Sequence, residues 1–210
     1  MVEKTLVLVF ACALLSGAVS AASASTLDLG AKAGYSNLTG DKNDAFESGP
    51  VGGFFLEYGV SPYIGLQGSW LLHKHDATGD ARAFADFLAS EAIGLPALTD
   101  ATLTINQFDF NGKFSYPLKS AKPYILAGMG FNYWKVNGST AVGEFQSREE
   151  QAFWDVSLNV GGGVSFKLWE RITIGGELIY TYIFDDYSDG FFNLLAALSY
   201  GFFFSEGYPD

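Results

Sequence analysis

The chain has 210 residues, a formal net charge of −11 and an aromatic content of 16%. The acidic balance excludes a general affinity for nucleic acids or heparin-like polyanions, because these ligands are bound through basic patches. After an N-terminal apolar stretch, no run of apolar residues approaches the roughly 18 residues that a membrane-spanning helix needs. The many aromatic side chains therefore require either a large core or a wall of strands that faces lipid.

The first residues have the organisation of a secretory signal peptide. Lys4 precedes an apolar stretch over Thr5–Leu15, and small residues follow. Such a leader directs export and is then cleaved. Cys12, the only cysteine, would be removed with it, which leaves the mature chain without thiol or disulfide chemistry. We therefore predict a signal peptide over residues 1–24 and a single domain over residues 25–210.

Apolar and polar residues alternate along most of the remaining chain. Side chains of a β-strand point to opposite sides in turn, so this alternation predicts strands with one apolar and one polar face. The longest run, Trp154 to Leu168, is long enough to cross a bilayer, which takes about nine to eleven tilted residues. The predicted strands are residues 27–35, 51–60, 63–75, 103–116, 124–136, 154–168, 172–184 and 192–204.

The links between these strands alternate in length. The long links are Asn37–Ser48, Asp76–Asp100, Asn137–Gln151 and Asp185–Gly190, and the short links are Ser61–Pro62, Pro117–Lys122 and Trp169–Arg171. Outer-membrane barrels have short periplasmic turns and longer external loops. The sequence therefore predicts an all-β fold, an eight-stranded antiparallel up-and-down transmembrane barrel with long extracellular loops and both termini in the periplasm.

The long links carry most of the negative charge. Together they contain 14 acidic residues against three basic ones, Lys42, Arg82 and Arg148. This composition keeps the loops soluble and favours a basic protein partner or divalent cations over polyanions.

The second long link also contains a helical pattern. Asp80 could cap a helix that runs to about Ile93. At helical spacing, Phe84, Phe87 and Leu88 fall on one side of it. These three residues are candidates for a loop contact with the barrel mouth, the outer leaflet, or a protein or lipid partner.

Seven charged residues alternate onto the polar face of the strands. An eight-stranded barrel is only just wide enough for side chains to fill it, so we expect these charges to pair inside it. Glu57 and Glu177 beside Asp109 would also suit acid–base chemistry, but paired structural roles are favoured over catalysis, and a wide pore is disfavoured. The predicted interior network is Lys32, Glu57, Asp109, Lys113, Asp155, Lys167 and Glu177.

The only two histidines lie two residues apart at the end of the third predicted strand. His73 and His75 could share a metal ion, with Asp76 as a further ligand. We expect instead that both face inward at a solvated rim. No serine and no His-x-Ser pattern accompanies them to indicate a nucleophile, so no catalytic residue and no cofactor are assigned.

Several short motifs resemble a known family. Pro123-Tyr124-Ile125 followed by Ala127-Gly128-Met129-Gly130-Phe131 is similar to the fifth strand of small eight-stranded outer-membrane barrels. Asn159-Val160-Gly161-Gly162-Gly163-Val164 and the aromatic end Tyr200, Phe202, Phe204 are similar as well. The family includes the membrane domain of outer membrane protein A, the opacity proteins and related surface antigens.

This resemblance implies a porin-like barrel in the cell envelope of a Gram-negative bacterium. Its expected partners are outer-membrane lipid, lipopolysaccharide and the barrel-assembly machinery, which reads a terminal aromatic residue. Ser205–Asp210 follow Phe204, which departs from the family pattern.

We expect a non-enzymatic protein with a structural or adhesin-like role, acting through its acidic loops. The alternatives are an outer-leaflet lipid-modifying enzyme and a narrow channel or small-ligand-binding barrel. A soluble lipocalin-like barrel conflicts with the outward aromatic faces.

Overall fold

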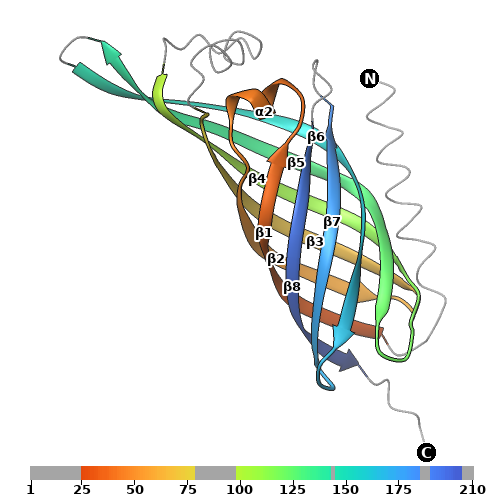
Figure 1. Cartoon of the computed structure of the whole chain (residues 1–210). Helices are drawn as coiled ribbons and strands as arrows, with labels where there is room; N and C mark the ends of the chain where they lie inside the picture. The colour runs from red at the N-terminus through yellow and green to blue at the C-terminus, as the bar shows by residue number, and fades with distance from the viewer. Residues whose placement is uncertain (1–24, 79–97, 143–144, 185–189, 205–210) are drawn as a thin grey trace, which may run out of the picture.

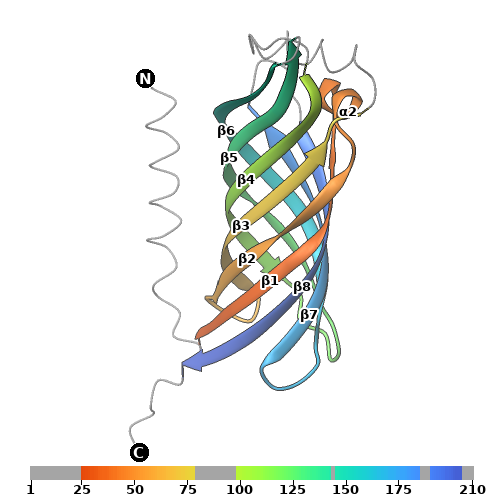
Figure 2. The ribbon, with the colours of Figure 1, turned by 90° about the vertical axis from the view of Figure 1, so that its left-hand side faces the viewer.

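The computed structural model describes residues 25–78, 98–142, 145–184 and 190–204. These residues form a closed antiparallel barrel in which each strand pairs with the next along the chain, and β8 pairs back with β1 (Figures 1 and 2). The strands are β1 (Ser25–Leu38), β2 (Gly49–Gly59), β3 (Ile64–Asp76), β4 (Leu98–Ser115), β5 (Lys122–Val142), β6 (Phe145–Lys167), β7 (Ile172–Ile183) and β8 (Gly190–Phe204).

The predicted fold class is confirmed, and each predicted strand overlaps one strand of the barrel. Closure runs along β1 and β8, from the pair Ser25–Phe204 to the pair Leu38–Phe191. The strand ends Ser25 and Phe204 lie with the short links at one end of the barrel, which we call the turn end (Figure 2). The opposite end, where the long links lie, is called the loop end.

The prediction was wrong about the third long link, Asn137–Gln151. The structure continues β5 and β6 through it, pairing Asn137 with Glu150 and Val142 with Phe145. This hairpin lies beyond the stretch in which β6 also pairs with β7, and alternation is imposed only where a wall separates an apolar from a polar side. Its strands therefore lack the sequence alternation on which the prediction depended. β4 likewise begins at Leu98, inside the predicted link Asp76–Asp100.

The first long link contains a helix that the sequence did not predict. α2 (Asp41–Ala45) follows Gly40, whose φ of 69° lies in the left-handed region that glycine adopts readily. Backbone bonds tie the link to the end of β3 and the residues just after it, with Glu47 N donating to Asp76 O at 2.9 Å and Thr78 N to Ala45 O at 2.9 Å. α2 therefore folds over the loop end of the barrel.

Two predictions lie outside the described residues. They are the signal peptide over residues 1–24 and the helix over residues 80–93, with its contacts Phe84, Phe87 and Leu88.

The outer wall is apolar over most of its height. Phe110, Ile125 and Leu194 are each 65% exposed. Leu158 on β6 and Leu178 on β7 are about half exposed, and they lie on the outer face as their alternation predicted. Contiguous exposed apolar surface of this extent is typical of a membrane contact. No helix among the described residues is long and apolar enough to cross a bilayer.

Candidate functional site

The turn-end half of the lumen contains two buried ion pairs joined by an amide. Lys32 Nζ lies 2.6 Å from Glu177 Oε2, and Lys113 Nζ lies 2.7 Å from Glu57 Oε2. Gln67 joins the pairs, since its Oε1 accepts from Lys32 Nζ at 2.8 Å and its Nε2 donates to Glu57 Oε2 at 3.3 Å. The four charges, which come from β1, β2, β4 and β7, therefore neutralise one another inside the barrel, as buried charges must.

Aromatic rings enclose these ions. The Tyr124 hydroxyl donates to Glu177 Oε1 at 2.7 Å, and Lys113 Nζ lies 3.8 Å from the centre of the Tyr124 ring. Lys32 Nζ lies 5.0 Å from the centre of the Phe55 ring. The cavity beside Glu57 and Glu177 measures about 90 Å³. That volume is well below the roughly 300–1,000 Å³ of small-molecule pockets, so the cavity does not suit an organic substrate.

A second polar group occupies the middle of the lumen around Asp109. Its carboxylate is 1% exposed and accepts from Gln107 Nε2 at 2.9 Å, Asn159 Nδ2 at 2.9 Å and Ser69 Oγ at 3.3 Å. Gln107 Nε2 also donates to Thr181 Oγ1 at 3.2 Å. Gln107 therefore ties β4 to β7 through the centre of the barrel.

The structure does not assemble a carboxylate pair of the kind that acid–base catalysis needs. Glu57 and Glu177 are each bound to a lysine, and Asp109 is held by amides and a hydroxyl instead. Among the described residues, these three carboxylates are thus committed to structural contacts.

The two histidines face inward as predicted. The expectation of a solvated rim was wrong, because both side chains are buried. Both are 0% exposed, with ring centres 6.3 Å apart. His73 Nε2 lies 2.9 Å from Gln107 Oε1, and His75 Nδ1 donates to the Glu47 carbonyl oxygen at 2.9 Å. The link containing α2 covers them, which no local pattern could indicate.

The three predicted metal candidates do not converge. Asp76 is exposed on the outer face of β3, one residue after His75, and accepts from Thr102 Oγ1 at 3.1 Å. Strand alternation sends it away from both imidazoles. Within the described ranges, no group of three or more His, Cys, Asp or Glu side chains is placed to hold a metal ion.

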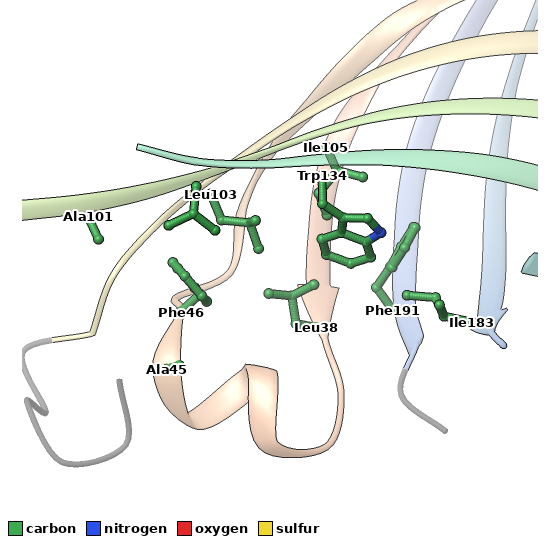
Figure 3. Packing of buried hydrophobic residues seen from close by; sticks show 10 residues of the cluster. Leu38, Ala45, Phe46, Ala101, Leu103, Ile105, Trp134, Ile183 and Phe191 are labelled. Atoms are coloured by element: carbon green, nitrogen blue, oxygen red, sulfur yellow. The ribbon is translucent and has the colours of Figure 1, made fainter. Parts of the chain in front are cut away.

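The loop-end half of the lumen is filled by apolar side chains, which sequence reasoning missed. Trp134 stacks on Phe153 at 5.9 Å, and Phe191 meets the edges of Trp134 at 6.2 Å and His73 at 5.1 Å. Ala45 and Phe46 close the group from α2 and the residue after it (Figure 3). We call it the apolar plug, and its members are Leu38, Ala45, Phe46, Ala101, Leu103, Ile105, Trp134, Val136, Ile183 and Phe191.

Two predicted network residues lie apart from the buried ion pairs. Asp155 is half-buried on β6, and Lys167 is exposed at the turn end of the same strand. The other five, Lys32, Glu57, Asp109, Lys113 and Glu177, are all buried.

With the lumen filled, the candidate functional surface is the loop end. β6 pairs with β7 only from Ser157 onward, so among the described residues its first part pairs with β5 alone. The stretch from Phe145 to Val156 spans roughly 35 Å at the usual rise of a strand. Figure 1 shows the β5–β6 hairpin projecting away from the barrel, and β4 stays paired with β5 as far as Thr140.

Comparison with known proteins places this geometry in a family. The family model for the outer membrane protein beta-barrel domain matches residues 8–202. The comparison with curated proteins gives no match.

Three solved structures illustrate the similarity of fold. A major outer membrane protein from Thermus thermophilus aligns with a TM-score of 0.62 and 13% identity, covering 86% of this chain and 100% of that one. Neisserial surface protein A aligns at 0.59 and 15% identity, covering 84% and 97%. Ail of Yersinia pestis, the attachment invasion locus protein, solved with the heparin analogue sucrose octasulfate, aligns at 0.55 and 14% identity, covering 86% and 99%.

Proposed function

Since the chain belongs to the outer membrane β-barrel family, we propose that it is a non-enzymatic surface protein that binds a partner through its loop end. The loop end faces outward from the cell, and the strand ends at the turn end face the periplasm. The observation that carries the proposal is the β5–β6 hairpin, which stays paired from Asn137–Glu150 to Val142–Phe145 beyond the wall. A paired hairpin presents its contact residues with less ordering cost than a flexible loop.

The filled lumen supports this role over transport or catalysis. Buried ion pairs occupy the turn-end half, and the apolar plug occupies the loop-end half. Neither leaves room for a substrate, and the buried carboxylates are held by lysines, amides and hydroxyls. We therefore expect the function to depend on the surface of the loop end.

The sequence of the loop end favours a basic protein as the partner. The link Asn137–Gln151, which forms the tip of the hairpin, contains three acidic residues, Glu144, Glu149 and Glu150, and one basic residue, Arg148. The four predicted long links together contain 14 acidic residues. Ail, the structural neighbour with attachment in its name, was solved with a sulfated anion. The charge of this chain indicates a partner of the opposite sign, because complementary potentials steer association.

Shortening the hairpin tests the proposal. We expect that replacing Gly138–Glu149 with an Asn-Gly turn, which suits a two-residue hairpin, leaves the barrel folded. Bacteria displaying this variant should lose adhesion to surfaces coated with a basic protein, measured against a neutral protein coat. A second variant, Glu149→Lys with Glu150→Lys, keeps the hairpin length and should weaken adhesion through charge alone. Adhesion of both variants at the level of the full chain would contradict the proposal.

A further inference from the structure

The buried charges of the lumen do not cancel. Among the described residues, the buried acidic and lysine side chains inside the barrel are Lys32, Glu57, Asp109, Lys113 and Glu177. Two of them are cations and three are anions. Both lysines are held by glutamates, at 2.6 Å for Lys32 and 2.7 Å for Lys113. The negative charge of Asp109 is therefore left without a cation, and an isolated buried carboxylate is costly.

The hydrogen-bond partners of Asp109 in the described part of the chain are all neutral. The amides of Gln107 and Asn159 each donate to Oδ1 at 2.9 Å. The Ser69 hydroxyl donates to the other carboxylate oxygen at 3.3 Å. These bonds stabilise the carboxylate, but they do not cancel its charge.

The two buried histidines do not supply the missing positive charge. A protonated imidazole carries an N–H on both ring nitrogens. His73 Nε2 lies 2.9 Å from Gln107 Oε1, but His73 Nδ1 and His75 Nε2 have no hydrogen-bond partner within the described ranges. The His73 ring also meets the edge of Phe191 at 5.1 Å. Protonation would bury a charge and leave a donor unsatisfied, so the neutral rings are favoured.

A hydroxyl oxygen approaches Asp109 over a glycine. The register sets Asp109, Gly130 and Ser157 in one row across β4, β5 and β6. Gly130 has no side chain, and an ideal Cβ atom there would lie 2.5 Å from Asp109 Oδ1 and 2.8 Å from Ser157 Oγ. The carboxylate and the hydroxyl therefore converge over the same glycine.

Two amides on neighbouring strands add further oxygens to this group. Asn132 follows Gly130 by two residues on β5, and Asn159 follows Ser157 by two residues on β6, so both face the lumen. All three polar side chains are at most 3% exposed. Ser157 Oγ, Asn132 Oδ1 and Asn159 Oδ1 have no hydrogen-bond partner among the residues that the structure describes. Oxygens of this kind around an anion repel one another unless a positive group lies between them.

The chemistry of these oxygens selects the ligand. Carboxylate, amide and hydroxyl oxygens bind hard cations. A monovalent cation would bring the buried charge of the lumen to zero, whereas a divalent cation would leave an excess positive charge there.

We propose that the lumen binds one alkali cation, for which sodium is the probe, at the Asp109 carboxylate. Ser157 Oγ and the amide oxygens of Asn132 and Asn159 are its neutral ligands. The ion neutralises Asp109 and joins β4, β5 and β6 at the middle of the barrel. It should therefore stabilise the folded protein.

Refolding with and without sodium tests this proposal. The protein is refolded from urea into an uncharged detergent, so that the site fills as the barrel closes. The buffers contain sodium chloride or N-methylglucamine chloride, whose cation is too large for a buried site, at the same mildly alkaline pH and ionic strength. A ligand that binds only the folded state raises the melting temperature as its concentration rises. We expect Tm to rise with sodium and then level off, and equilibrium dialysis with radioactive sodium to detect one ion per barrel.

Two variants separate the charge from the neutral ligands. Asp109→Asn keeps the shape of the side chain and removes its charge, so Tm should no longer respond to sodium and dialysis should detect no bound ion. Ser157→Ala keeps the charge and removes one oxygen ligand. The sodium concentration at half the effect should then rise by on the order of tenfold. Ser157→Ala deletes a single hydroxyl, so it provides the test if Asp109→Asn does not assemble.

Two matched controls make the same chemical changes elsewhere. Asp76→Asn removes an exposed carboxylate at the loop end. Ser199→Ala removes a hydroxyl beside the turn-end cavity. Both should keep the sodium response of the unaltered protein.

Three outcomes would overturn the proposal. The first is a Tm of the unaltered protein that depends no more on sodium than on N-methylglucamine, which would mean that a proton or water occupies the site. The second is a full sodium response in Asp109→Asn. The third is an unchanged half-effect concentration in Ser157→Ala.

Discussion

The two halves of the lumen are both filled by side chains, but with opposite chemistry. In the turn-end half, Lys32 and Glu177 are 2% and 3% exposed and joined as ions. In the loop-end half, Trp134 and Phe191 are both 0% exposed and meet edge to face. Closure of the barrel satisfies the backbone hydrogen bonds without help from side chains. The side chains inside can therefore be ionic or apolar. The ionic half depends on specific partners, whereas the apolar half depends on volume.

The ionic half should be the easier to break with a single change. Lys32→Ala leaves Glu177 buried without its lysine, and removing one partner of a buried pair costs about 3–5 kcal/mol. The free energy of unfolding, measured by urea titration in lipid vesicles, should fall by that amount. A double variant, Lys32→Met with Glu177→Gln, removes both charges and should recover a large part of the loss. Stability of Lys32→Ala equal to the unaltered protein would show that the pair is not buried in the folded barrel.

The apolar half should respond to lost volume. Leu38 is 1% exposed inside the plug, and Leu38→Ala should lower the free energy of unfolding by about 3 kcal/mol through the cavity that it leaves. Leu29→Ala on the outer face of the same strand, where the side chain is 52% exposed, is the matched control and should cost less. Equal losses from the two variants would contradict the assignment of Leu38 to a packed interior.

A change at the boundary between the halves should have the smallest effect of the three. Gln107→Leu keeps the approximate volume but removes the amide that bonds Asp109, Thr181 and His73. Leaving buried polar groups without a partner costs about 1–3 kcal/mol each, offset in part by the new apolar contact. We expect a net loss of about 1–2 kcal/mol in the same urea titration. A gain in stability would mean that these groups find other partners.

Alternation along the chain was enough to predict the barrel and the facing of Leu158, Lys32 and Glu57. The lipid-facing and lumen-facing sides differ in polarity wherever the wall lies in the membrane, so the period of two is imposed there. Past that band the pattern ends, which is why the β5–β6 hairpin was predicted as a loop. α2, with five residues, is too short to leave a helical period.

The interior contacts could not be predicted in detail for a different reason. Sequence alternation indicates that Lys32 and Glu177 face inward, but not which charges meet across the lumen. The partners depend on strand stagger, which brings Lys32 of β1 to Glu177 of β7, two strands away across β8. The apolar plug was missed because Leu103, Ile105 and Trp134 are inward apolar residues, whereas a polar interior was expected along the whole barrel.

The central claim is that the apolar plug closes the lumen. Ion conductance in a planar lipid bilayer is the most direct test of it. The unaltered protein should insert without producing long-lived conductance steps, because ions do not enter an apolar constriction without water. A Trp134→Gly, Phe191→Gly double variant removes two of the three aromatic rings of the plug and should raise conductance above that baseline. Stable, ohmic steps from the unaltered protein would contradict the account, since they require an open aqueous path through the barrel.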